Sequence, residues 1–271
     1  MKKCVVCESK QCEALFIIDE VKIVRCRDCG LVRTLGKAKI SYKEYHRDDD
    51  YAKHEQLFRN IFHKRFDRVK RYKKGGRVLD IGASTGTMLQ IFKFHGWDVW
   101  GVEPSNSAEG LSEKGIKCTN STFEKAKLPT NYFDVVIINH VLEHVENPVS
   151  FLEKVNEVLK KDGIVYVDVP NFDSLISMIR GKNWKYLSPG EHLYHFTPKT
   201  LENTLKRAGF EIIWCGTSSG VFDVARPLLK LAYEARYLRR NFLFDIFRVP
   251  LDIASQISNR GASLAVIAKK S

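Results

Sequence analysis

Runs of apolar, often β-branched residues alternate with segments of helical periodicity along most of the chain. The apolar runs are typical of buried strands, and the segments between them repeat their apolar positions every three or four residues. The predicted strands are 77–81, 98–102, 116–119, 133–139, 164–169, 210–215 and 264–268, and the predicted helices are 87–94, 108–114, 149–159 and 200–208, with a closing turn at 160–163. This alternation predicts an α/β fold, a Rossmann-like, doubly wound, mostly parallel seven-stranded sheet that binds ligands at the carboxyl ends of its strands.

Composition is that of an ordinary globular protein. The chain has 271 residues, 44% hydrophobic and 28% charged, which suffices for one sizeable α/β domain and a small appendage. No apolar run has the ~18 residues of a membrane helix and no signal-peptide core follows the first residues, so we expect a cytosolic protein. The net charge of +12 fits an anionic partner, but dispersed lysines would give the same charge. Without an arginine-rich tract or an aromatic–basic repeat, nucleic acid is not favoured.

Two CxxC pairs mark the N-terminal region. Cys4 and Cys7 form the first pair, and Cys26 and Cys29 form the second. Each pair can turn tightly and offer two thiolates, so that together they supply the tetrahedral sulfur set that Zn²⁺ prefers. Iron in a rubredoxin-like site is the alternative. Because four sulfur ligands leave no open position, we predict a structural, zinc-ribbon-like module over residues 1–35.

A glycine-containing loop follows the first predicted strand. Gly82 and Gly86 let the backbone approach a ligand, and the helix that begins there favours a negative group. The spacing is G-x-x-x-G rather than G-x-G-x-x-G, and Asp80 would repel a pyrophosphate, so an aminoacyl group fits better than a nicotinamide dinucleotide. Glu103, at the end of the next strand, is placed as a ribose-hydroxyl acceptor.

These motifs resemble the class I S-adenosylmethionine-dependent methyltransferases, most of all the small-molecule branch related to quinone-biosynthesis and sugar methyltransferases. The resemblance is carried by VLDIGASTGTML (78–89), VWGVEPS (99–105), FEKAKLPTNYFDVVIINHVLEHVENP (123–148), LKKDGIVYVDVPN (159–171) and GEHLYHFTPKTLENTLKRAGF (190–210). Ser84 stands where the family often has glycine. The resemblance implies a site for S-adenosylmethionine formed by Asp80, Gly82, Ala83 and Gly86 at the methionine part, Glu103 and Pro104 near the ribose, Phe123 and Glu124 at the adenine edge, and Asn139 and His140 at the sulfonium.

Candidate catalytic residues fall in two segments. Methyl transfer is an in-line displacement that often requires removal of a proton from the acceptor. His140 lies at a strand end, while His144 in the same stretch is expected to be structural. Glu191 and His192 follow the fifth strand, where a substrate lid would sit, and resemble a pair used by zinc-containing sugar C-methyltransferases. We predict His192 as the general base, with Glu191 and His140 as further catalytic residues.

The remaining segments complete the predicted domain organisation. Residues 36–74 are expected to form a helical linker and cofactor lid, in which Tyr45 and Tyr51 would cap the cofactor. The methyltransferase domain follows over 75–271. Its basic, apolar segment 217–260 is expected to be a helical insertion, either packed on the sheet, in contact with a membrane or a lipid-linked substrate, or at a dimer contact.

The sequence therefore predicts an S-adenosylmethionine-dependent methyltransferase that acts on a small molecule, such as a sugar, a polysaccharide precursor or a lipid-like compound. An RNA or protein methyltransferase whose zinc ribbon recognises the partner is the alternative. It is less favoured because neither base-stacking aromatic platforms nor an Asn/Asp-Pro-Pro-Tyr motif is evident. A scaffold that binds the cofactor without turnover is a third possibility. Acceptor atom and oligomeric state are not predicted.

Overall fold

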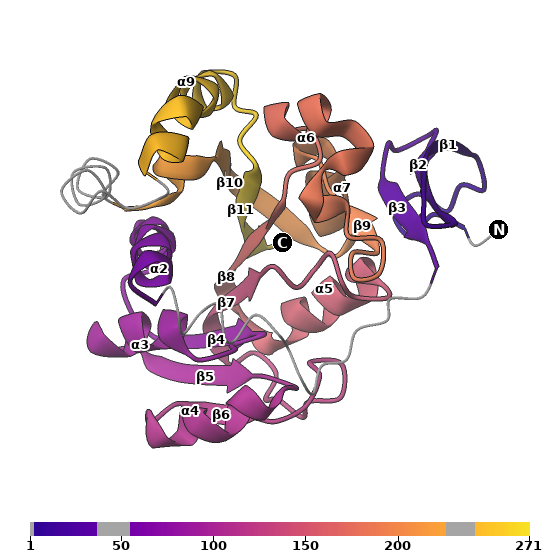
Figure 1. Ribbon diagram of the computed structural model, residues 1–271. Coiled ribbons are helices and arrows are strands. Elements are labelled where there is room, and N and C mark those ends of the chain that lie inside the picture. The colour runs from indigo at the N-terminus through magenta and orange to yellow at the C-terminus, as the bar shows by residue number, and fades with distance from the viewer. Residues whose placement is uncertain (1–2, 37–54, 226–241) are drawn as a thin grey trace.

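A seven-stranded sheet forms the core of the protein (Figure 1). The computed structural model describes residues 3–36, 55–225 and 242–271. In spatial order the strands are β10 (Phe210–Ser218), β11 (Ser263–Lys270), β8 (Leu159–Pro170), β7 (Phe133–Asn139), β4 (Arg77–Ile81), β5 (Asp98–Val102) and β6 (Lys117–Thr119). Strands β8, β7, β4, β5 and β6 pair in parallel, and β11 and β10 extend the sheet antiparallel. The predicted Rossmann-like fold is confirmed.

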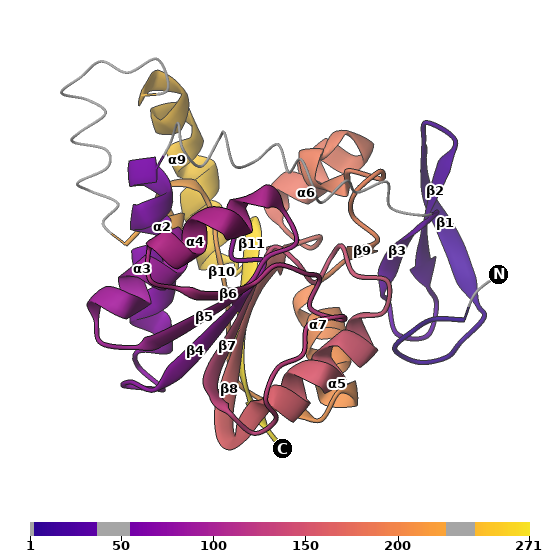
Figure 2. The same ribbon diagram turned by 90° about the horizontal axis from the view of Figure 1, so that it is seen from below.

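Helices cover both faces of this sheet (Figure 2). On one face lie α2 (Glu55–Val69), α3 (Thr87–Phe94) and α4 (Glu109–Glu113), and on the other lie α5 (Pro148–Val158) and α7 (Pro198–Arg207). Successive strand residues point to opposite faces, so Val135 and Ile137 pack with the first set and Val136 and Ile138 with the second. Burial on both faces explains why these strands read as continuous apolar runs.

The predicted turn at 160–163 is wrong, because these residues belong to β8. Leu159 is fully buried and pairs with Phe133, and a register shift follows between Phe133 and Val135. The shift accommodates the polar residues within the strand. Helix α5 begins at Pro148 and ends at Val158. At its start, the side chain of Asn147 accepts hydrogen bonds from the backbone amides of Val149 and Ser150.

A small antiparallel sheet forms the N-terminal module. It consists of β1 (Cys12–Ile18), β2 (Val21–Cys26), β3 (Val32–Leu35) and, from the core, β9 (Tyr194–His195). Ile23 and Val32 are buried against Trp184 and Leu187 from the core, so the module is docked by side chains as well as by strand pairing. The sequence predicts the module but not β9.

The insertion before the last strand contains a helix, as predicted. Helix α9 (Phe242–Ile257) packs against the 3₁₀ turn η4 (Gly220–Asp223) and against β10. The Asn259 side chain accepts hydrogen bonds from the backbone and the hydroxyl of Thr217, which fixes the return to the sheet. These contacts favour the packed arrangement for the described part of the insertion; contact with a membrane or a second subunit stays a prediction. Residues 226–241, like Tyr45 and Tyr51, lie outside the described residues.

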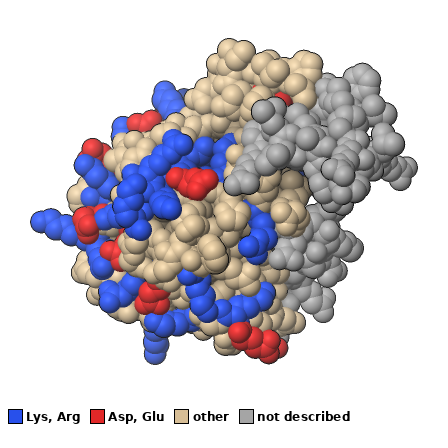
Figure 3. Space-filling model, turned by 90° about the vertical axis from the view of Figure 1, so that its left-hand side faces the viewer, with Lys and Arg blue, Asp and Glu red and all other residues tan. Residues whose placement is uncertain are grey.

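The remaining short elements connect this framework. They are η1 (Asn106–Ala108), α6 (Leu175–Arg180), η2 (Gly181–Asn183) and η3 (Lys185–Leu187). In the part of the chain that the structure describes, no helix combines the length and the apolar character that a membrane span requires. Lysine and arginine side chains are spread over the face shown in Figure 3, and acidic side chains lie among them.

Candidate active site

A cavity opens at the carboxyl ends of β4, β5 and β7, where the sequence predicts the ligand. Except for Gly86, every residue predicted to bind the cofactor lines this cavity: Asp80, Gly82, Ala83, Glu103, Pro104, Phe123, Glu124, Asn139 and His140. Sequence reasoning did not assign Phe62, Thr122, His144 and Phe151 to it. Of these, Phe62 could not be predicted from the strand and loop motifs, because it lies on α2, outside them.

The two glycines of the loop after β4 are required by backbone geometry. Gly82 has φ 79°, and a Cβ atom there would lie 2.6 Å from Val141 Cγ2. Gly86 has φ 75°, and a Cβ atom would lie 2.5 Å from Leu111 Cδ2. Gly86 therefore shapes the start of α3 rather than lining the cavity. Ser84 also adopts a left-handed conformation, with φ 44°, at the position where the family often has glycine.

Two buried acids face the cavity. Asp80 is 4% exposed, and its Oδ1 atom has no hydrogen-bond partner within the described chain. Burial, and then the nearby Glu103, raise the pKa of Asp80 well above its usual range. Glu103 is held by the backbone amides of Ser84 and Ser105, which donate to its two oxygens at 2.7 and 2.8 Å. An acceptor without a partner suits the ammonium group of an aminoacyl ligand, and Glu103 keeps lone pairs for ribose hydroxyls.

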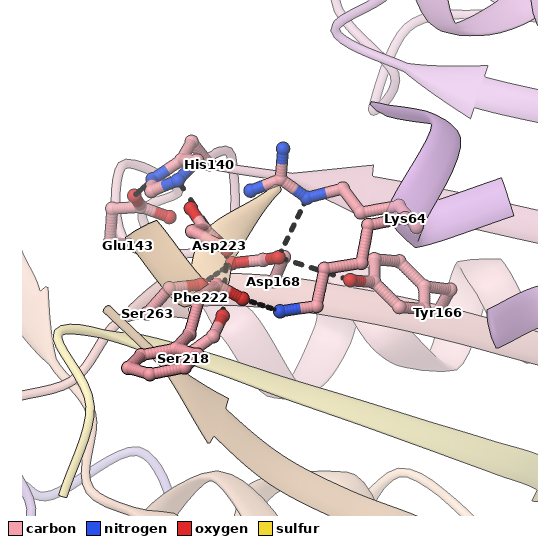
Figure 4. Close-up of polar contacts among 10 residues, drawn as sticks. Lys64, His140, Glu143, Tyr166, Asp168, Ser218, Phe222, Asp223 and Ser263 are labelled. Atoms are coloured by element: carbon pink, nitrogen blue, oxygen red, sulfur yellow. Dashed lines mark hydrogen bonds and ion pairs between the residues drawn. The ribbon is translucent and has the colours of Figure 1, made fainter. Parts of the chain in front are cut away.

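His140 belongs to a polar network beside the cavity that is centred on Asp168 (Figure 4). Its Nδ1 atom lies 3.2 Å from Glu143 Oε1, and its Nε2 atom 4.0 Å from Asp168 Oδ1. Asp168 accepts hydrogen bonds from Arg65 Nε at 2.8 Å, Tyr166 Oη at 3.1 Å and Ser263 Oγ at 2.7 Å. Although burial opposes its charge, Arg65 holds the pKa of Asp168 below its usual range. The His140 side chain is 24% exposed, so a ligand can reach it.

Sequence reasoning missed Asp168 and its partner Arg65 in this network. Asp168 gives a signal that could have been used, because it is a charged residue inside an otherwise apolar strand. Arg65 gives none, since basic residues occur throughout α2.

The family model described as "Methyltransferase domain" matches residues 51–214, more than half of the chain. The chain belongs to this family. The prediction of an S-adenosylmethionine-dependent methyltransferase is thereby confirmed.

Several individual proteins are similar to this chain. A ubiquinone biosynthesis O-methyltransferase of Azorhizobium caulinodans is 30% identical over 59% of this chain and 68% of its own length. An uncharacterised protein of Methanocaldococcus jannaschii is 29% identical over 56% of this chain and 73% of its own. Two solved structures share the fold. A SAM-dependent methyltransferase from Archaeoglobus fulgidus has a TM-score of 0.57, 24% identity and coverage of 81% and 99%. The 1,6-didemethyltoxoflavin-N1-methyltransferase of Burkholderia thailandensis has a TM-score of 0.54, 14% identity and coverage of 96% and 99%.

The side of the cavity with the predicted adenine contacts is fixed by a lysine that sequence reasoning also missed. Lys154 Nζ donates hydrogen bonds to the carbonyl oxygens of Phe123 at 2.7 Å, Glu124 at 2.9 Å and Ala126 at 2.9 Å. Phe123 is buried and packs on Phe151, with ring centroids 4.9 Å apart. In the sequence, Lys154 looks like any lysine of an amphipathic helix. It positions the loop that carries the predicted adenine-binding residues.

The Glu191–His192 pair occupies a segment beside the cavity. His192 is 1% exposed and does not line the cavity; it contacts His144, which does, with ring centroids 4.7 Å apart. Its Nδ1 atom lies 2.7 Å from the carbonyl oxygen of Tyr186, and burial lowers its pKa to about 4. The catalytic roles of Glu191 and His192 stay predictions.

The N-terminal module holds this segment in place. The backbone amide of Thr34 donates to the carbonyl oxygen of Leu193 at 2.9 Å, and the Thr34 hydroxyl donates to that of His192 at 2.7 Å. The same hydroxyl lies 3.0 Å from His195 Nε2. The module thus shapes the neighbourhood of His192 directly.

The four predicted metal ligands come together at the base of the module. The Sγ atoms of Cys4 and Cys29, and those of Cys7 and Cys26, are 3.5 Å apart, and all four sulfurs lie within 4.8 Å of one another. Sulfurs bound to one tetrahedral zinc ion lie about 3.8 Å apart, so the donor set fits this ion.

Proposed function

We propose that the protein transfers a methyl group to an oxygen atom of a small-molecule acceptor that binds beside His140. The observation that carries this proposal is the position of His140, held between two carboxylates on the cavity that also contains Asp80 and Glu103. The O-methyltransferase relative supports oxygen as the acceptor atom. A sugar, a polysaccharide precursor or a lipid-like compound would each supply such an oxygen.

The cofactor would be held by residues already in place. Asp80 would accept from the ammonium group, Glu103 from the ribose hydroxyls, and Phe123 with Glu124 would contact the adenine. When bound, S-adenosylmethionine supplies an electrophilic methyl group on a sulfonium. Asn139, whose Oδ1 atom has no partner among the described residues, faces the same cavity and could contact this region.

His140, which lines the cavity whereas His192 does not, would act as the general base toward the acceptor in place of His192. Its Nδ1 atom donates to Glu143 Oε1, which leaves the Nε2 lone pair free to accept a proton. Despite full burial, the hydrogen bond from His140 lowers the pKa of Glu143 to about 2, so this carboxylate is charged at neutral pH. Asp168, 4.0 Å from Nε2, would stabilise the imidazolium that forms.

We also propose that Cys4, Cys7, Cys26 and Cys29 bind Zn²⁺ in a structural role. The spacing of the sulfurs and the docking of the module on Leu193 support this. A cytosolic location is proposed from the sequence alone.

The His140→Asn variant tests the role of His140. His140 has φ 54°, a conformation that asparagine tolerates, so the variant should fold. We expect the transfer of labelled methyl groups from S-adenosylmethionine into a small-molecule metabolite extract to fall at least ~100-fold. Affinity for S-adenosylhomocysteine should stay within about threefold, as it should in the control His95→Asn. Unchanged methyl transfer by His140→Asn would remove this histidine from the mechanism.

A further inference from the structure

Three buried side chains next to the cavity lie close together, and each has a polar atom without a partner among the described residues. They are Glu143, His144 and His192, which are 1%, 9% and 1% exposed. Glu143 Oε2, His144 Nε2 and His192 Nε2 have no hydrogen-bond partner in the described part of the chain. One ligand-type atom from each residue lies within 4.8 Å of the others. Buried polar atoms are normally paired, so this convergence requires an explanation.

The free atoms of both histidines are in the state that binds a metal ion. The Nδ1 atom of His144 lies 3.1 Å from the carbonyl oxygen of Glu191, and that of His192 lies 2.7 Å from the carbonyl oxygen of Tyr186. A carbonyl oxygen can only accept, so each Nδ1 carries the proton and each Nε2 keeps its lone pair. Metal-binding histidines are commonly oriented by a backbone carbonyl in this way.

Only one oxygen of the Glu143 carboxylate has a hydrogen-bond partner among the described residues. Glu143 Oε1 accepts the hydrogen bond from His140 at 3.2 Å, which leaves Oε2 for another partner. Buried carboxylate oxygens are normally paired, so Oε2 calls for a donor or a cation nearby. Neither imidazole of the cluster offers a proton at Nε2.

The backbone holds the cluster together without a ligand. The amides of Leu193 and Tyr194 both donate to the carbonyl oxygen of Glu143, at 2.8 and 3.1 Å. The Tyr194 hydroxyl donates to the carbonyl oxygen of Glu146 at 2.9 Å. Two segments that are distant in sequence are therefore joined at the residues that carry the three side chains.

We propose that Glu143, His144 and His192 bind a divalent transition-metal ion such as Zn²⁺, at a site separate from the four-cysteine cluster. Two imidazoles and one carboxylate suit zinc, iron(II) or cobalt(II), whereas Mg²⁺ prefers oxygen ligands. Ligand atoms on a tetrahedral zinc ion lie about 3.4 Å apart, so the side chains would close by roughly an ångström.

Such an ion would keep a coordination position for an oxygen ligand. Three protein ligands leave a fourth position open, as in hydrolytic zinc sites. His144 lines the cofactor cavity, so that an oxygen of water or of an acceptor can approach from this side. The metal site does not depend on the proposed methyl transfer to oxygen, and His140 would keep its own role.

Metal stoichiometry tests the site on the full chain. The purified protein is equilibrated with a small excess of Zn²⁺, desalted, and its zinc content is measured by mass spectrometry. We expect the wild type to hold one equivalent more than each of His192→Gln, His144→Gln and Glu143→Gln. The control His195→Gln alters a buried histidine of the same segment outside the cluster, and should match the wild type. Equal zinc content in the wild type and the three variants would overturn the proposal.

Two further measurements keep the result independent of misfolding and of the cysteines. Stabilisation of each variant by S-adenosylhomocysteine in a thermal melt shows which ones are folded, and only these are compared. With Co²⁺ in place of Zn²⁺, the extra equivalent should lack thiolate-to-metal charge-transfer absorption, and Mg²⁺ should not compete for it. A wild type whose entire bound Co²⁺ shows thiolate ligation would contradict the site without any variant.

Discussion

The cofactor cavity and the Glu191–His195 segment are neighbours, yet they are built in different ways. Asp80, Glu103 and Asn139 each lie at or just after the end of a core strand, and the backbone around them supplies their geometry. The Glu191–His195 segment instead takes its position from Thr34 in the N-terminal sheet and from Glu143 in the turn after β7. Cofactor binding should therefore be insensitive to the module, while the environment of His192 should depend on it.

The largest expected effect concerns the cofactor side. We expect Asp80→Asn to weaken the binding of S-adenosylhomocysteine about 100-fold in isothermal titration, because an amide, unlike the carboxyl group, cannot give up a proton and pair with the ammonium group as a carboxylate. Asp98→Asn, which changes a partly exposed aspartate of β5, is the control and should bind normally. Equal affinity of Asp80→Asn and wild type would show that the amino group is held elsewhere.

The same variant should not lose stability. The pKa of Asp80 is raised in the folded state, so the folded protein keeps this proton when the unfolded chain has lost it. The contribution of Asp80 to the free energy of unfolding therefore falls as the pH rises above about 4. Asp80→Asn lacks this loss, and its melting temperature at pH 7 should equal or exceed that of the wild type without ligand.

Removal of the proposed zinc ion from the four-cysteine cluster should affect the two regions differently. We expect amide hydrogen exchange at 191–195 to accelerate at least tenfold, because the strand that pairs with β9 loses its anchor. Affinity for S-adenosylhomocysteine should change less than about threefold. A matched loss of cofactor affinity would show that the cavity also depends on the module.

Thr34→Val tests the dependence of the Glu191–His195 segment on the module by removing a single hydroxyl group. It removes the hydrogen bond to the carbonyl oxygen of His192 and should cost about 1–2 kcal/mol in the free energy of unfolding. Exchange at 191–195 should accelerate while cofactor affinity is unchanged. Thr204→Val, another buried threonine, is the control and should leave exchange at 191–195 as it is.

The smallest expected effect lies on the adenine side. Lys154→Met removes three hydrogen bonds to the loop 123–126 and should weaken S-adenosylhomocysteine binding about three- to tenfold. Lys117→Met, at an exposed ion pair with Asp98, should have no effect. If both variants bind equally well, the loop does not need Lys154 to hold its shape.

The same contrast explains what the sequence could predict. The strands at 77–81, 98–102 and 133–139 and the residues that follow them are local features, so motif and periodicity were enough. Gly86 fits the sequence motif, but it is required by the backbone conformation and does not line the cavity. The spacing of the glycines alone cannot distinguish these two roles. The Arg65–Asp168 pair, β9 and the contact of His192 with His144 join segments that only the folded chain brings together.

A crystal structure of the complex with S-adenosylhomocysteine tests the central claim most directly. We predict the amino group at Asp80, the ribose hydroxyls at Glu103, the adenine against Phe123 and the sulfur directed toward His140. A cofactor bound away from Asp80 and Glu103, or with its sulfur directed away from His140, would contradict this account of the active site.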